Sequence, residues 1–411
     1  MPSRVIIPLS QHVGAPCEPL VKVGDAVAVG QKIGDSQSFV SAPVHASVSG
    51  KVVAIEPYPG PGGAPVMSIV IESDGQDRVA DGIAPRGALA SLSADEIKAI
   101  IREAGVVGMG GAGFPTHVKI APPKDKKVDV YIINAAECEP YVTCDHRLML
   151  ERPQDIVFGL RALMKAAGVS RGYIGIEDNK PDAIAAMLKA VEREDGITVV
   201  ALKTKYPQGG EKQLINAVTG RVVPSGGLPA DVGVLVSNVG TAVAVADAIK
   251  TGMPVIERVV TVTGPIVRSP KNLRVRIGTP FADLIEQCGG LTAPAAKIIN
   301  GGPMMGIAQP TLEAPVAKGT SCLLALGETD LDAVPARPCI RCARCVDACP
   351  IHLMPVWISQ YAERGMYDEA AKLNAVDCIE CGTCAYVCPS RRPLVEAIRV
   401  AKRVALAKRR K

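Results

Sequence analysis

The sequence predicts a multidomain α/β protein, on three observations. Its 411 residues suffice for two to four domains of ordinary size. Residues 91–255 alternate between helical and strand-like segments, which is typical of a parallel sheet covered by helices. Eight of the thirteen cysteines repeat one spacing twice near the C-terminus, which indicates a separate small module. Hydrophobic residues make up 48% of the chain but aromatic residues only 3%, so we expect cores built from aliphatic side chains.

The amino-acid pattern argues against membrane insertion and secretion. No stretch of about 18 residues is free of charged or strongly polar side chains, so no membrane-spanning helix is expected. The chain starts MPSRVIIPLSQHVGAP, in which proline and glutamine interrupt a short apolar run, unlike a secretory signal peptide. We therefore expect a non-secreted chain.

Positive charge is concentrated at the C-terminus. The formal net charge is +5, yet residues 391–411 alone hold nine Lys or Arg side chains and one acid, Glu396. We assign residues 393–411 to a basic tail, which either contacts anionic lipid or an acidic partner or is a solvated helix end. Nucleic acid is not an expected partner, because no aromatic residues alternate with the charges.

Residues 1–80 predict a small all-β module. Glycine-centred turns separate short strand-like runs at 5–7, 24–27, 30–34, 41–45 and 48–53. The stretches VKVGDAVAVGQKIG and SAPVHASVSGKVVAI resemble the barrel-sandwich fold of biotinyl and lipoyl carriers. A carrier needs a lysine at the exposed hairpin between them, where this chain reads DSQSFV. We therefore predict a docking module and no carrier arm.

Residues 91–255 predict a Rossmann-like α/β domain. It opens with an amphipathic helix over Asp95–Glu103, with Ser93 as its N-cap. Strand-like runs follow at 128–133, 173–176, 197–202 and 232–236, and helical segments at 153–168, 181–194, 211–218 and 241–250. Residues 256–330 return to strand signals at 258–262 and 272–277, with one helix near 280–288.

The glycine-rich loop GMGGAG at 108–113 has the spacing G-x-G-x-x-G. The dinucleotide fingerprint requires a strand before this loop and a helix after it. Here a helix precedes the loop and a proline-rich segment follows, so we reject an ordinary Rossmann site. The loop still offers bare backbone N–H groups to a phosphate or a flat ring, with Lys119 as a cationic partner and Phe114 as a stacking face. A flexible turn is the alternative interpretation.

Three further segments lie where predicted strands end or helices begin. The two acids of NAAECEP at 134–140 suit hydrogen bonds to a ribose or a nicotinamide amide, and two surface acids in a turn would have the same pattern. YPQGGEK at 206–212 is a bare-backbone turn that opens a helix, or a simple helix start. SNVGT at 237–241 leads from a strand into a helix N-terminus, where an anion can bind.

Eight cysteines form two copies of C-x-x-C-x-x-C-x-x-x-C-P. This is the bacterial two-cluster ferredoxin run, in which three thiolates hold one cluster and the fourth crosses to the other. The sequence therefore predicts one 4Fe–4S cluster on Cys339, Cys342, Cys345 and Cys388, and a second on Cys378, Cys381, Cys384 and Cys349. One alternative is disulfide bonding, but disulfides are rare in chains that are not secreted. The other is a structural zinc site, which would need only four ligands.

The segments GMGGAGFPTHVK, NAAECEP, YPQGGEKQL and SNVGTA occur in the order found in the NADH- and FMN-binding subunit of respiratory complex I. The whole arrangement resembles more closely the C subunits of Rnf complexes, the membrane-bound ferredoxin:NAD oxidoreductases. The resemblance covers residues 5–390. It implies a barrel-sandwich hybrid over 1–80, an FMN/NADH-binding α/β domain over 91–255, a β-grasp soluble-ligand-binding domain over 256–330 and an α-helical two-cluster ferredoxin domain over 331–392.

The resemblance also implies roles for individual residues. Those expected to bind FMN are Gly108, Gly110, Gly111 and Lys119, with Asn134 and Glu137 at the flavin and Gly209, Gly210 and Asn238 as further contacts. Phe114 would stack on the nicotinamide nucleotide, and Glu139 and Glu211 match the acids that meet NADH in the complex I relative.

The expected chemistry follows from the cofactors. NAD(H) exchanges a hydride whereas an iron–sulfur cluster passes one electron, so a flavin must lie between them. Hydride exchange between nicotinamide C4 and flavin N5 needs no side chain as acid or base. Single electrons would then pass through both clusters to or from other Rnf subunits, where ion transport takes place. The resemblance implies a peripheral location on the cytoplasmic face of the cell membrane, held by these partners.

Two alternatives remain at this point. The cobalamin reductase of propanediol-degrading microcompartments shares the flavin and two-cluster parts, but the module at 1–80 and the basic tail favour an Rnf subunit. The second is a flavin-free electron-relay scaffold, against which the intact glycine loop with Phe114 and Lys119 argues.

Overall fold

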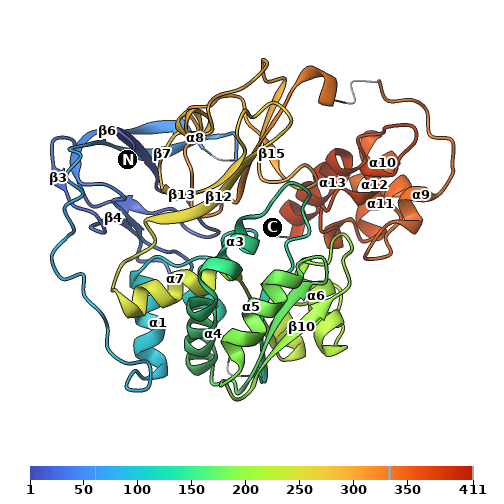
Figure 1. Ribbon diagram of the computed structural model, residues 1–411. Coiled ribbons are helices and arrows are strands. Elements are labelled where there is room, and N and C mark those ends of the chain that lie inside the picture. The colour runs from blue at the N-terminus through green and yellow to red at the C-terminus, as the bar shows by residue number, and fades with distance from the viewer. Residues whose placement is uncertain (61, 124, 332–334, 410–411) are drawn as a thin grey trace.

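The protein is described by a computed structural model that covers residues 1–60, 62–123, 125–331 and 335–409. Figure 1 shows the N-terminal strands beside the β-rich segment that follows residue 256, with the α/β domain below both. The cysteine-rich helices form a separate group at one side of the molecule. Among the described residues, no helix has both the length and the apolar character needed to cross a bilayer.

Two small sheets form the N-terminal part, in the orders β1-β7-β6-β3 and β2-β4-β5. Their strands are β1 (Arg4–Pro8), β2 (Glu18–Pro19), β3 (Ala26–Val27), β4 (Lys32–Asp35), β5 (Val44–His45), β6 (Gly50–Pro59) and β7 (Pro65–Ser73). Val5, Ile7, Ile69 and Ile71 pack into one aliphatic core, as the low aromatic content predicts. Strand β7, which pairs with β1 and β6, was not predicted from the sequence, although its Ile69-Val70-Ile71 run is typical of a strand.

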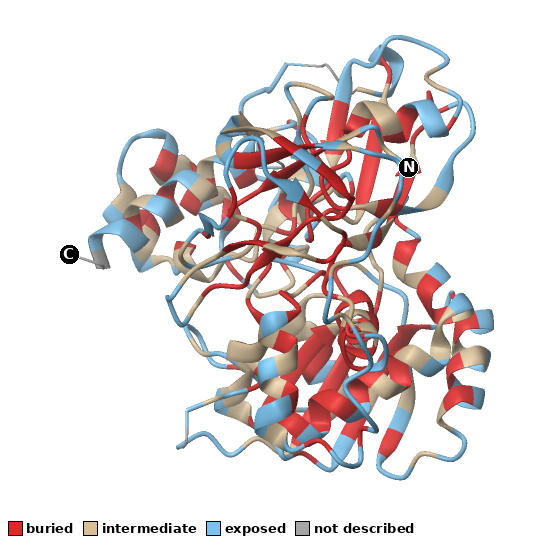
Figure 2. Ribbon diagram, turned by 90° about the vertical axis from the view of Figure 1, so that its left-hand side faces the viewer, coloured by how far each residue is buried: buried red, intermediate tan, exposed pale blue. Residues whose placement is uncertain are grey.

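A four-stranded parallel sheet of order β10-β9-β8-β11 forms the centre of the α/β domain. Its strands are β8 (Val130–Ala135), β9 (Arg171–Glu177), β10 (Ile197–Leu202) and β11 (Val234–Asn238). Side chains of β8 alternate between the two faces, so that Tyr131 and Ile133 join one core and Val130 and Ile132 the other. Figure 2 shows buried residues concentrated on these strands and on the inner faces of the helices around them.

The helices of this domain are α1 (Ala94–Glu103), α2 (Thr116–Lys119), α3 (Cys144–Glu151), α4 (Pro153–Ala167), α5 (Pro181–Val191), α6 (Glu211–Thr219) and α7 (Val239–Lys250), with a 3-10 turn η1 (Pro229–Val232). Ser93 caps α1 as predicted, accepting a hydrogen bond from the backbone of Glu96. Helix α3 was not predicted. The segment after Gly113 contains only the single turn α2, in agreement with its proline content.

Residues after 256 form a mixed five-stranded sheet of order β13-β12-β16-β14-β15. Its strands are β12 (Glu257–Thr263), β13 (Lys271–Arg276), β14 (Lys297–Asn300), β15 (Ile307–Ala308) and β16 (Cys322–Leu326), with helix α8 (Phe281–Gln287) and a 3-10 turn η2 (Glu328–Asp330). The fully buried Phe281 joins α8 to the core of this sheet.

The cysteine-rich module is helical, with α9 (Arg344–Asp347), α10 (Pro355–Glu363), α11 (Tyr367–Lys372), η3 (Ala375–Asp377), α12 (Thr383–Tyr386) and α13 (Leu394–Arg409). The segment assigned to a basic tail is α13, and its Ile398 and Ala401 belong to the module's core. Its basic side chains Arg399 and Lys402 are paired with Glu380, and Lys408 with Asp368. Arg410 and Lys411 lie outside the described residues.

Candidate functional site

Asn134 and Asn238 are register partners at the carboxyl ends of β8 and β11. The chain runs from β8 to β9 and β10 on one side, whereas β11 lies on the other side of β8. The carboxyl edge beside such a reversal of strand order is where open α/β sheets bind ligands. The NAAECEP and SNVGT segments therefore meet at one edge of the sheet.

The glycine loop is fixed against this edge by backbone contacts. The Gly108 N–H donates to Phe114 O at 2.9 Å and closes the loop. Thr241 Oγ1 accepts from Met109 N at 3.0 Å and donates to Val107 O at 3.1 Å. Thr241 ends the SNVGT segment but was not singled out as a candidate residue from the sequence. Its hydroxyl ties the loop to the first turn of α7.

The middle of the loop is open. Gly110, Gly111 and Ala112 are exposed, and a Cβ at Gly111 would meet no atom within 4 Å. A Cβ at Gly110 would lie 2.8 Å from Asn238 Nδ2, so only glycine permits this close approach. Bare, accessible backbone of this kind fits a phosphate or a planar ring system. Phe114 at the end of the loop is half-buried.

Glu137 lies at the N-terminus of α3, where its carboxylate accepts from Asp145 N at 2.8 Å and His146 N at 3.1 Å. Burial and the charge of nearby Asp145 raise the pKa of Glu137 to about 7. Burial likewise raises the pKa of Asp145. Oxygens of these two acids and the Cys144 sulfur lie within 4.8 Å of one another.

Asp145 connects this acid pair to the glycine loop. Its Oδ2 accepts from Asn238 Nδ2 at 2.6 Å, while Asn238 Oδ1 caps α7 by accepting from Gly240 N at 2.8 Å. Asp145 was not among the residues predicted from the sequence. An acid at the start of a helical segment, eight residues after Glu137, was a weak signal because α3 itself was not predicted.

The YPQGGEK turn packs beneath the end of β8. Asn134 Nδ2 donates to Gly209 O at 2.8 Å, and a Cβ at Gly209 would lie 2.3 Å from Ala136 O. Gly210 is the N-cap residue of α6, whose first residue, Glu211, forms an ion pair with Lys119 at 3.0 Å. Lys119 also donates to Val236 O at 2.8 Å. Two side chains expected to meet different ligands therefore contact each other.

Glu139 turns away from β8 toward the five-stranded sheet. Its carboxylate accepts from Met304 N at 3.1 Å and Met305 N at 2.7 Å, and burial raises its pKa. A Cβ at Gly302 would lie 2.3 Å from Glu139 Oε2. The loop NGGPMMG at 300–306 is thus part of the site. Its glycine content was the sequence signal that could have indicated this role, although it was not used.

The two cysteine runs have the same backbone. Arg341 and Glu380, each two residues after the first cysteine, adopt left-handed φ of 58° and 57°. Their N–H groups each lie 3.4 Å from the sulfur of that cysteine, Cys339 or Cys378. Left-handed non-glycine residues are uncommon, and their recurrence at one position indicates loops shaped around a ligand.

Cysteines from the two runs lie near one another in two places. One pocket is lined by Cys378, Cys381, Cys384 and Cys349, the last from the other run. Burial raises the pKa of Cys345, and nearby Cys388 and Cys339 raise it further. Each group thus contains one cysteine of the other run.

Neither alternative to clusters fits this geometry. None of the thirteen cysteines, each a described residue, forms a disulfide bond. Among described residues, no three cysteine sulfurs lie within 4.8 Å of one another, whereas sulfurs around one tetrahedral zinc would be about 3.8 Å apart, given Zn–S of about 2.3 Å. The described sulfurs are therefore too far apart to surround one zinc ion.

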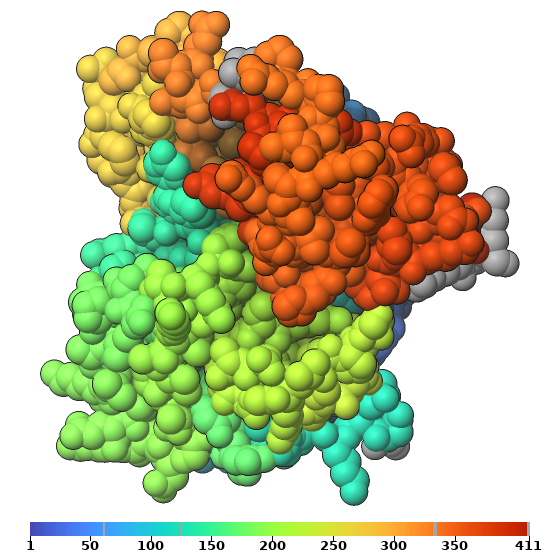
Figure 3. Space-filling view, turned by 90° about the vertical axis from the view of Figure 1, so that its right-hand side faces the viewer, coloured from blue at the N-terminus to red at the C-terminus, as the bar shows by residue number. Residues whose placement is uncertain are grey.

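The second cysteine group faces the edge of the α/β domain. Tyr206 Oη donates to Cys381 O at 2.7 Å, and a Cβ at Gly382 would lie 2.7 Å from Met304 O. In Figure 3 the cysteine-rich module rests directly on the α/β domain. The same turn and loop therefore contact both the sheet edge and the cysteine module.

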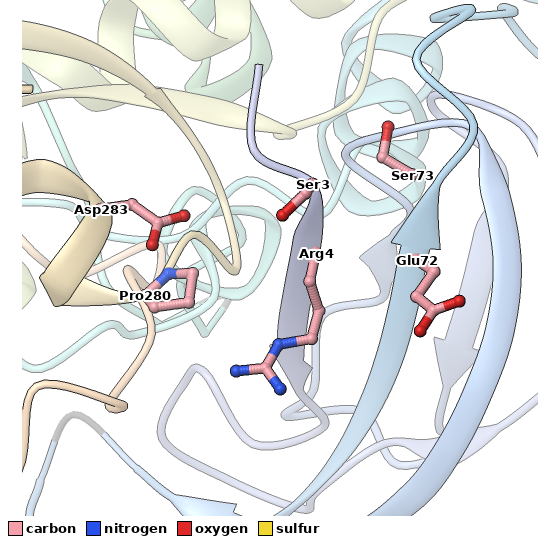
Figure 4. Close-up of a pocket in the computed structure, with 6 residues that line it drawn as sticks. All are labelled: Ser3, Arg4, Glu72, Ser73, Pro280 and Asp283. Carbon is pink, nitrogen blue, oxygen red and sulfur yellow. The ribbon is translucent and has the colours of Figure 1, made fainter.

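A further pocket lies elsewhere, between β1, β7 and the start of α8 (Figure 4). Its lining, which includes Arg4, Glu72 and Asp283, contains none of the predicted site residues. Arg4 is paired with Glu313 at 2.9 Å, so its charge is already balanced.

Four family models match consecutive segments of the chain. Their descriptions are RnfC barrel sandwich hybrid domain for residues 1–76, Nuo51 FMN-binding domain for 101–247, SLBB domain for 259–308 and 4Fe-4S dicluster domain for 338–391.

Curated relatives match over nearly the whole chain. The chain is 53% identical over 410 residues to the C subunit of the Na+-translocating ferredoxin:NAD+ oxidoreductase complex of Acetobacterium woodii, covering 100% of this chain and 93% of the relative. It is 53% identical over 403 residues to the C subunit of the proton-translocating ferredoxin:NAD+ oxidoreductase complex of Clostridium ljungdahlii, covering 98% and 88%. The chain belongs to the RnfC family. The resemblance read from the sequence motifs is therefore confirmed, together with the four kinds of domain.

A further RnfC relative agrees with this assignment, and a solved structure has the same fold. The chain is 43% identical over 406 residues to the C subunit of the ion-translocating oxidoreductase complex of Rhodobacter capsulatus, covering 98% of this chain and 78% of the relative. A crystal structure of NAD+-reducing NiFe hydrogenase aligns with TM-score 0.54 at 19% identity, over 78% of this chain and 63% of the hydrogenase chain. The hydrogenase shares the fold. Nothing in these matches favours a cobalamin reductase or a flavin-free scaffold.

Proposed function

We propose that this RnfC chain exchanges electrons with NADH at a bound FMN and relays them through two 4Fe–4S clusters, as part of a complex that links ferredoxin and NAD to ion transport in other subunits. One observation carries the proposal: the turn at 206–210 and the loop at 300–306 contact both the sheet edge with the glycine loop and the second cysteine group. Bound FMN would supply the conversion between hydride and single-electron transfer.

In this proposal the open backbone of Gly108, Gly110 and Gly111 approaches the flavin and its phosphate. Gly209, Gly210 and Asn238 would line the other side of the flavin site. The chain approaches its neighbours closely there, since larger residues at both glycines would collide with neighbouring atoms. Asn134 and Glu137 lie at the same sheet edge, each held by backbone hydrogen bonds. Their fixed positions support a role in orienting the ring.

NADH would enter from the exposed side of the loop, where Phe114 offers a ring to the nicotinamide nucleotide. Glu139 and Glu211 are the acids available to its hydroxyl groups. The Glu211–Lys119 ion pair would open on binding, with Lys119 turning to the flavin phosphate and Glu211 to the nucleotide. At 28% and 41% side-chain exposure the pair is weak enough to exchange partners.

The proposed partners are the other subunits of the complex, on the cytoplasmic face of the cell membrane. The names of the relatives as subunits of ion-translocating complexes support partnership with such subunits. Direct membrane binding by the C-terminal segment has less support, because Arg399, Lys402 and Lys408 are paired within the module.

The test is the visible spectrum and iron content of anaerobically purified protein, before and after addition of NADH. We expect about one FMN and about eight irons per chain, and bleaching of the flavin band by NADH. Glu139→Gln should require more NADH for the same bleaching while keeping its iron, whereas the exposed Glu56→Gln should match the unaltered protein. Eight irons with no flavin retained after reconstitution would contradict the proposal.

A further inference from the structure

The two cysteine groups differ in exposure. Cys381, Cys384 and Cys349 of the second group are buried, and this group faces the turn at 206–210. In the first group Cys342 is exposed and Cys339, Cys345 and Cys388 are partly so. Figure 1 places α9, which contains Cys345, at the outer edge of the molecule. The first group is therefore at the surface that a partner protein could reach.

Three arginines lie in the same short stretch of chain as the first three cysteines of this exposed group. Arg337, Arg341 and Arg344 are all exposed, and none forms an ion pair with a described acid. The equivalent positions of the second run hold Val376, Glu380 and Thr383. Glu380 is itself neutralised by Arg399 at 2.7 Å and Lys402 at 2.9 Å. The unpaired positive charge is thus particular to the first run and is not required by the shared loop geometry.

Apolar side chains accompany these charges. Ile340, between Cys339 and Arg341, is 67% exposed, and Tyr386, two residues before Cys388, is 79% exposed. Helix α12, which ends at Tyr386, packs against α9, which begins at Arg344. An aromatic and aliphatic centre with an arginine rim is typical of protein–protein interfaces.

We propose that Arg337, Ile340, Arg341, Arg344 and Tyr386 form a docking surface for an acidic one-electron redox protein, and that the first cysteine group is the point of electron exchange with it. The inference rests on the proposed function, in which the second group lies on the flavin side. Three unpaired cations select an acidic partner surface and speed its encounter. One electron crosses in each encounter, so that one partner is oxidised as the other is reduced.

Variants taken from the second run test this surface without disturbing the loop. Arg341→Glu introduces the residue that Glu380 already places at the same left-handed φ. Adding Arg344→Thr copies Thr383. Arg86→Glu with Arg193→Thr makes the same charge change at two exposed arginines outside the module that form no described ion pair.

The experiment titrates an acidic bacterial two-cluster ferredoxin onto the reconstituted full chain by calorimetry, at about 50 mM and about 200 mM salt. We expect the dissociation constant of the double variant to rise about tenfold at low salt, and its salt dependence to weaken. The Arg86 and Arg193 control should bind like the unaltered chain. Iron content, and bleaching of the flavin by NADH, should be the same in all three proteins.

Several results would overturn the docking surface. One is unchanged ferredoxin affinity in the double variant, and another is an equal loss in the control. A third is loss of binding to phosphatidylglycerol vesicles with ferredoxin binding intact, which would make the arginines a membrane contact. A shift in cluster potential at unchanged affinity would assign them to the cluster instead. Failure of NADH to bleach the unaltered protein would remove the proposed function, while the ferredoxin titration would still report on the surface.

Discussion

Ala343 and Gly382 occupy the same position in the two cysteine runs, and both have a left-handed backbone, with φ of 61° and 81°. Each lies between the second and third cysteine of its run. Alanine in this conformation is strained, typically by about 1 kcal/mol, whereas glycine adopts it freely. The second run has less room as well, because Gly382 packs against the backbone of Met304.

Exchanging these residues should have opposite effects. In Gly382→Ala the added Cβ would lie 2.7 Å from Met304 O, so we expect loss of up to about four irons per chain and weaker docking of the module on the loop at 300–306. Ala343→Gly relieves strain and should keep about eight irons, with unfolding temperature equal or higher. Iron assay and thermal unfolding check both. Equal iron loss in the two variants would show that the contact between Gly382 and the loop at 300–306 does not determine how well the cluster is retained.

The crossing of ligands can be tested by matching the effects of single substitutions. If Cys388 belongs with Cys339, Cys342 and Cys345, then Cys388→Ser should remove the same electron paramagnetic resonance signal as Cys342→Ser. Cys349→Ser should instead match Cys381→Ser. In a pattern without crossing, Cys388→Ser would match Cys381→Ser. Each variant should retain about four irons.

Gly111→Ala separates ligand binding from folding. A Cβ at this position meets no atom of the chain within 4 Å, so the flavin-free protein should unfold at the same temperature as the unaltered one. If the flavin approaches this backbone closely, the methyl group should raise the FMN dissociation constant about tenfold, measured by fluorescence titration, as for a contact worth about 1.4 kcal/mol. Gly62→Ala is the matched control, because a Cβ at Gly62 also meets no atom within 4 Å. Gly226→Ala would not serve as a control, because Gly226 has φ of 69° and alanine there would be strained. Unchanged FMN affinity in Gly111→Ala would exclude this segment as the flavin contact.

Local patterns could be predicted from the sequence, and long-range contacts could not. Strand β10 has the expected bounds because Ile197–Leu202 is a short run rich in β-branched residues, which by itself indicates a strand. Helix α3 was not predicted because it is short and its apolar residues do not form a clear helical pattern in the sequence. Its buried residues Leu148 and Met149 are covered only once the neighbouring helices pack against them. The bond from Met304 to Glu139 spans 165 residues, and no local pattern pairs these segments. The repeated cysteine spacing, by contrast, is a local pattern that by itself indicates which thiols meet.

The Glu137–Asp145 pair predicts that stability depends on pH. Burial, then the Asp145 charge, raise the pKa of Glu137 from 4.5 to about 7. Between these values the folded chain binds more protons than the unfolded chain, so the free energy of unfolding falls as pH rises, by up to about 3 kcal/mol, and levels off above pH 7. Burial also raises the pKa of Asp145, and the hydrogen bond from Asn238 and the charges of Arg258 and Lys180 offset only part of this effect.

Glu137→Gln should remove this loss of stability. Glutamine stays neutral and its amide oxygen can still accept a backbone hydrogen bond at the start of α3, as Glu137 does from Asp145. We expect variant and unaltered protein to unfold at similar temperatures near pH 5, where Glu137 is protonated, and the variant to be more stable near pH 7.5. Thermal unfolding of flavin-free protein across this range measures the difference. Exposed Glu56→Gln should keep the original pH profile, and an unchanged profile in Glu137→Gln would place the titrating proton on another group.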